Sequence, residues 1–285
     1  MIKKFYTKFI STIISSYYLA NTYIARRYNR FHLGNFWIIF PTLTVLVGTL
    51  VSSTQLNLKS YGFEFHYTVW VILPFVVFRA ITESLDITQK LLQQVFILYR
   101  SVFIKNYDVF FASIIVTLYH IALDLILAVA VIIIFNFESI IYIFIYVYIF
   151  FFGIIIGVSM GVITGIISML IYDIRFFNKI LRIAIIFCTP IFYIMPKTGI
   201  VEFINKINPF TYIIVASRDV VIYGFNNNVI TCLIFSIPII LLAVFFTIKL
   251  KSYLKIINST LVKGVVGQTY ACSIVNKTPI KKIND

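Results

Sequence analysis

The chain has 285 residues, of which 61% are hydrophobic and 12% charged, and its formal net charge is +14. Soluble domains carry about twice this share of charged residues, so the composition excludes an ordinary soluble protein. The apolar runs are continuous and do not alternate in ~10-residue segments, which excludes a transmembrane barrel. We therefore expect an all-α integral membrane protein: a single transmembrane domain over residues 1–285 with about six transmembrane helices.

The N-terminal segment, residues 1–33, carries basic residues and no acidic one. Phe9, Ile13, Tyr17 and Ile24 fall on one helical face, which predicts an amphipathic helix lying in the membrane surface. We expect a first span over Phe36–Val51 and a second near Thr68–Ile81. The two tryptophans, Trp37 and Trp70, lie close to the ends of these spans, where tryptophan typically anchors a helix at the interface.

Residues 82–106 form the longest interior run that contains polar residues. Its apolar residues recur at helical spacing and its polar residues fill the other side, which predicts a separate amphipathic helix against one face of the membrane. Such a helix could couple the chain to a soluble energy source, or simply lie among the headgroups. The candidate residues are Lys90, Leu91, Gln94, Tyr99, Arg100 and Phe103.

A third span is expected over Val109–Phe135, and it contains His120 and Asp124 one helical turn apart. An acidic residue at mid-bilayer costs about 2.5–3.5 kcal/mol on insertion scales and is a functional candidate. This intramembrane polar pair could serve as a proton relay, or as a structural hydrogen-bonded contact between helices.

The fourth apolar run, Ile140–Tyr172, is longer than a bilayer requires. Its glycines recur at four-residue spacing, as Gly153, Gly157, Gly161 and Gly165. Such a ridge of small residues lets another helix approach closely, although it could also reflect backbone flexibility. We favour packing.

A fifth span near Ile180–Met195 is interrupted by Pro190. Residues 200–224 are too polar to span, and they predict two short re-entrant helices divided at Asn208-Pro209. A sixth span is expected over Val229–Ile248, followed by a basic tail over 249–285. With both termini in the cytoplasm, the outer segments hold only Lys59, Lys197, Lys206 and Arg218 of the 24 basic residues. This bias fixes the expected orientation and explains the net charge without nucleic acid.

The sequence contains no motif for catalysis or for nucleotide binding. Its nearest approach to a P-loop, Gly264–Thr269, lacks the lysine and the spacing. Cys188, Cys232 and Cys272 are scattered, so we expect neither a disulfide nor a metal site. We also expect no cleaved signal peptide, no cofactor on this chain and no enzymatic activity.

Three groups of residues, in order along Arg26–Gly224, resemble the membrane subunits of ATP-binding-cassette exporters for bacterial polysaccharides. The first is the motif at the junction of interface helix and first span: Arg27, Arg30, Leu33, Gly34, Trp37 and Pro41. The second is Asp173-Ile174-Arg175 followed by Thr189-Pro190-Ile191-Phe192-Tyr193. The third is Asn208-Pro209 followed by Arg218-Asp219 and Gly224.

The resemblance implies a homodimer in the bacterial cytoplasmic (inner) membrane that carries a lipid-linked polysaccharide. Separate ATPase subunits would bind ATP and Mg and act on the helix between spans two and three. The short helices before the last span would form an outer gate, with Pro190, Tyr193, Asn208, Pro209, Arg218 and Asp219 as its motif residues. Features of the O-antigen, teichoic acid and capsule branches occur together, so the subclass stays open.

Other functions fit the same sequence. An ATP-driven exporter of a drug or small lipid would share the architecture. A proton-coupled secondary transporter would need no ATPase and would depend on Asp124. A scaffold for glycan-assembly enzymes would transport nothing.

Overall fold

The computed structural model describes residues 2–28, 36–55, 67–98, 106–135, 137–171, 174–193 and 198–224, with isolated positions between 230 and 245. These parts of the chain are helical and contain no strand, which confirms the all-α prediction for the described residues. Three helices, Tyr67–Val95, Tyr107–Phe135 and Ile140–Ser168, are long and apolar enough to cross a membrane. The tail over 249–285 and most of the predicted sixth span lie outside the described residues.

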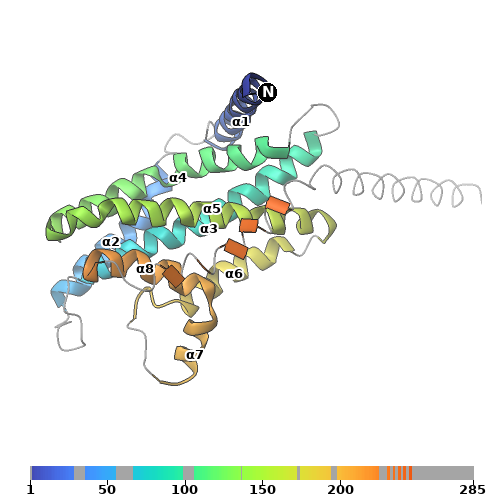
Figure 1. The fold of residues 1–285 in the computed structure, drawn as a ribbon. Coiled ribbons are helices and arrows are strands. Elements are labelled where there is room, and N and C mark those ends of the chain that lie inside the picture. The colour runs from blue at the N-terminus through green and yellow to red at the C-terminus, as the bar shows by residue number, and fades with distance from the viewer. Residues whose placement is uncertain are drawn as a thin grey trace, which may run out of the picture.

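Helix α3, Tyr67–Leu98, runs through the centre of the molecule. Every side chain from Thr68 to Thr82 is buried, as expected of a helix that is apolar on all sides. Helices α4 (Asn106–Phe135) and α5 (Ile143–Leu170) lie along α3 (Figure 1). A 3-10 helix, Phe137–Tyr142, leads from α4 into α5.

The glycines of α5 face α3, which confirms the predicted packing ridge. A Cβ atom at Gly161 would lie 2.6 Å from the Cβ of Thr88, and one at Gly157 would overlap the Ser84 hydroxyl and the Ile81 carbonyl. The Ser84 and Thr88 hydroxyls donate to carbonyl oxygens of their own helix, at Ile81 and Ser84. Small hydroxyl side chains therefore fit a buried contact without unpaired polar groups.

The prediction of a separate surface helix over 82–106 is wrong, because α3 continues without a break through this region to Leu98. No proline or glycine interrupts the sequence there, and the apolar face is used for packing inside the protein. Leu91, Leu92 and Val95 form a second core with α1, α4 and α5. The amphipathic periodicity is present in α3, but its apolar side meets other helices.

Two further helices precede α3 in the chain. The predicted amphipathic helix is present as α1, Ile2–Tyr28, whose Ala20 and Tyr23 pack in the second core while Ile13 and Tyr17 are exposed. Helix α2, Phe36–Gln55, continues through Pro41 and packs against α3. It is apolar over Ile39–Ser52, a stretch shorter than the three long candidate spans.

Helix α6, Ile174–Cys188, begins earlier and ends earlier than the predicted fifth span. It stops before Thr189-Pro190, because proline disfavours helical backbone at the residue before it. The predicted division at Asn208-Pro209 is confirmed by α7, Ile200–Ile207, and α8, Pro209–Tyr223 (Figure 1). Asn208 caps α8 by accepting from the Phe210 amide, with proline at the first helical position.

Candidate functional site

A buried ion pair joins α3 to α4. One guanidinium nitrogen of Arg79 (Nη1) lies 2.6 Å from the Asp124 carboxylate and donates to the Thr42 hydroxyl of α2, also at 2.6 Å. The side chain of Asp124 is fully buried and that of Arg79 is 9% exposed. The guanidinium thereby ties together three helices that are distant in sequence.

This ion pair gives Asp124 a partner that the sequence analysis does not name. Arg79 lies within α3 and pairs with Asp124, which the sequence analysis groups with His120. His120 is buried one turn earlier on α4. Protonating Asp124 would leave Arg79 buried without its counter-charge, so the geometry favours a structural role over a proton relay. A charge within the apolar run around Arg79 is the signal that could have predicted an acidic partner.

Several predicted gate residues come together where the end of α6 meets α8, a region we name the α6–α8 junction (Cys188, Pro190, Asn208, Arg218 and Asp219). Arg218 donates to the Pro190 carbonyl at 3.2 Å and to the Asp219 carboxylate at 3.1 Å. Asn208 donates to the Cys188 carbonyl at 3.2 Å. The Cys188 carbonyl at the end of α6 and the Pro190 carbonyl just beyond it thus accept hydrogen bonds from residues of the following segments.

Trp70 and Tyr193 lie next to the α6–α8 junction. Trp70 was predicted to anchor α3 at the membrane interface, but it is buried, and the Arg218 guanidinium carbon lies 3.7 Å from its ring centroid. This stacking explains how Arg218, assigned to an outer segment, is accommodated away from water. Tyr193 donates to the Asn205 side chain of α7 at 3.3 Å.

A polar seam that the sequence analysis missed attaches α6 to α3 and α5. Arg182 is hydrogen-bonded to Asp86 and lies 3.8 Å from the Glu83 carboxylate. Asn178 donates to Gln89 and, more weakly, to Thr164. Glu83, Asp86 and Gln89 are spaced three residues apart, so they form a polar stripe on one face of α3. This stripe becomes recognisable only when residues 67–98 are treated as one helix.

The predicted coupling residues divide into three groups. Lys90 is exposed and Gln94 is half-buried near the end of α3. Leu91 is completely buried in the second core, so it packs α3 against its neighbours and cannot contact a docked partner directly. Tyr99, Arg100 and Phe103 lie outside the described residues.

The first motif is only partly covered by the structure. Arg27 falls in the last turn of α1, and Trp37 and Pro41 fall in α2. Arg30, Leu33 and Gly34 lie outside the described residues. Among the residues that the structure describes, no group of three His, Cys, Asp or Glu side chains could hold a metal ion. No known protein family and no curated protein matches the chain significantly.

Proposed function

We propose that this chain is the membrane permease subunit of an ATP-driven exporter that moves a lipid-linked polysaccharide out of the cytoplasm. The observation that carries the proposal is the α6–α8 junction. Pro190 belongs to the second group of the resemblance and Arg218 to the third, and Arg218 donates directly to the Pro190 carbonyl. Asn208, also of the third group, bonds to the neighbouring Cys188 carbonyl. The contacts between these two groups support the proposal.

The proposed subunit forms a six-span homodimer with both termini in the cytoplasm. Its partner ATPase binds ATP and Mg and hydrolyses the nucleotide, because this chain has no P-loop. The described part of the chain supplies three long apolar helices in support of this arrangement. The cargo is of the O-antigen, teichoic acid or capsule type.

Helix α3 offers a direct mechanical link between the ATPase and the outer junction. Lys90 is exposed near one end of α3, whereas Trp70 lies near the other end under Arg218. These residues are twenty positions apart in one continuous helix, a distance of about 30 Å. The close α3–α5 contact makes this helix rigid. A displacement of α3 near Lys90, caused by the ATPase, would therefore move Trp70 and the α6–α8 junction as well.

Charge reversal near the ATPase-facing end of α3 tests this proposal. We expect Lys90→Glu and Arg100→Glu to abolish surface display of the glycan, with the glycan accumulating inside the cell. Lys179→Glu is the matched control, because Lys179 is an exposed lysine on α6. Normal surface glycan in both the Lys90 and the Arg100 variant, at normal protein level, would contradict the coupling role.

A proton-coupled transporter is the main alternative from another class. It would require Asp124 to gain and lose a proton during transport. The Arg79 guanidinium at 2.6 Å opposes this, because it stabilises the ionised carboxylate. No specific contact among the described residues favours a drug exporter or a non-transporting scaffold.

A further inference from the structure

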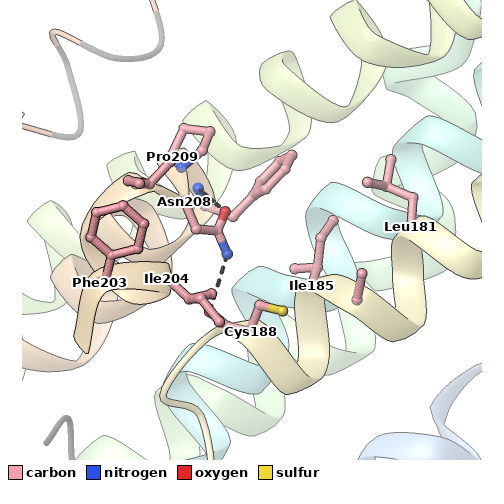
Figure 2. A pocket seen from close by; sticks show the side chains of 10 residues that line it. Leu181, Ile185, Cys188, Phe203, Ile204, Asn208 and Pro209 are labelled. Atoms are coloured by element: carbon pink, nitrogen blue, oxygen red, sulfur yellow. Dashed lines mark hydrogen bonds between the residues drawn. The ribbon is translucent and has the colours of Figure 1, made fainter. Parts of the chain in front are cut away.

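An apolar pocket of about 360 Å³ lies between α6, α7 and the start of α8 (Figure 2). Its walls include Leu181, Ile185 and Cys188 of α6 and Phe203, Ile204 and Ile207 of α7. Asn208 also lines the pocket, but its amide nitrogen donates to the Cys188 carbonyl and its oxygen accepts from the Phe210 amide (Figure 2). The walls therefore present carbon atoms and lack a charged group to recognise a polar ligand.

The pocket opens at the surface, because two of its wall residues, Phe203 and Ile207, are 66% and 61% exposed. The surface around it is apolar as well, with Ile183 and Phe187 of α6 and Ile200 of α7 all exposed. So many exposed apolar side chains on two helices require a covering on a folded protein. The pocket is thus an apolar recess on helices that also expose apolar side chains.

Helix α6 indicates what covers this surface. Its polar residues Asn178 and Arg182 bond to α3, whereas Ile180, Ile183 and Phe187 are exposed, and Lys179 is the exposed charge near the start of the helix. A helix at the surface of a soluble protein has the opposite arrangement, with its apolar stripe toward the core. An outward apolar face matches the hydrocarbon region of a membrane.

We propose that the pocket between α6, α7 and α8 binds one aliphatic chain of a lipid. A helix from another protein is about 10 Å wide, too wide to enter a recess of this volume. A flexible alkyl chain fits it and gains van der Waals contacts on several sides, which bulk lipid packs less closely. Assigning the chain to the lipid anchor of the cargo rests on the proposed function, whereas a membrane phospholipid presents the same chemistry.

The test uses the full chain in lipid nanodiscs without any ATPase, so it does not depend on export. Two probes carry a diazirine on the aliphatic chain: a phosphatidylcholine and a polyprenyl phosphate. After irradiation, mass spectrometry locates the adducts, which we expect on residues 181–188 and 203–210. Ala184→Trp fills the pocket from its wall, and Ile183→Trp places the same side chain on the outward face of α6 as a matched control.

Ala184→Trp should reduce the adducts roughly tenfold, since losing about ten carbon–carbon contacts lowers binding by this factor. Ile183→Trp should leave them unchanged. Equal labelling of both variants would overturn the proposal. So would a cross-link between two copies through Cys188 in a Cys232→Ser/Cys272→Ser background, because it would place a second chain in the pocket.

The two probes distinguish the source of the chain. A clear preference for the polyprenyl probe supports the aliphatic site and assigns it to the cargo anchor. Equal labelling by the two probes supports the site and assigns it to membrane lipid. Failure of the export assay with intact labelling would refute the proposed function and leave the pocket assignment standing.

Discussion

Replacing Asp124 by leucine would leave Arg79 buried in α3 without its counter-charge. Removing one partner of a buried ion pair costs about 3–5 kcal/mol of stability. The loss should fall in this range, because the Asp124 side chain is fully buried and its carboxylate lies 2.6 Å from the Arg79 guanidinium. At about 2–4 °C per kcal/mol, the variant should melt roughly 10 °C below the wild type.

The double variant Arg79→Met/Asp124→Leu supplies the decisive comparison. It removes both charges and fills the space with apolar side chains, so most of the lost stability should return. Thermal melting of the purified protein in detergent, followed by size-exclusion chromatography, measures the three proteins side by side. A double variant that melts as low as Asp124→Leu would refute the structural role of the pair.

The same variants separate the two transport mechanisms. An ATP-driven exporter should keep its surface glycan in the double variant, whereas a proton-coupled transporter would lose transport without Asp124. Stable protein with no transport would therefore favour the proton relay that the sequence left open.

Three further predictions concern packing and the α6–α8 junction, and detergent melting checks each. Gly157→Ala should cost about 1–3 kcal/mol because its new methyl group overlaps α3, whereas Gly48→Ala, which meets open space, should be neutral or stabilising. Asn208→Ala should cost about 1–2 kcal/mol, and Asn208→Ser should cost less because serine keeps the helix cap. Arg218→Lys should cost about 1 kcal/mol by losing the stacking on Trp70. Equal melting within either matched pair, or no effect at Arg218, would contradict the corresponding contact.

Local patterns predicted the elements of this fold that depend on neighbouring residues alone. The break at Asn208-Pro209 follows from proline geometry, and the small-residue ridge of α5 follows from the spacing of its glycines. The predicted fifth span extends to Met195, whereas α6 ends at Cys188. Pro190 disfavours helical backbone at Thr189, so the sequence does contain the signal for this earlier end.

Contacts between distant helices could not be predicted in the same way. Periodicity over residues 82–98 identified an apolar face, but it cannot tell whether that face meets lipid or protein, and the structure shows that it meets α1, α4 and α5. The partner of Asp124 lies 45 residues away on α3, so it becomes evident only when the two helices are placed side by side. Trp70 was misassigned because only the fold brings Arg218 over its ring.

The central claim is that this chain works with a separate ATPase, and purification from native membranes tests it most directly. The tagged full-length protein, extracted in two mild detergents, should bring with it a P-loop ATPase subunit in equal amount. Lys90→Glu with Arg100→Glu should weaken this association, and Lys179→Glu should not. A clean dimer or monomer without any ATPase in both detergents would contradict the account and return attention to Asp124.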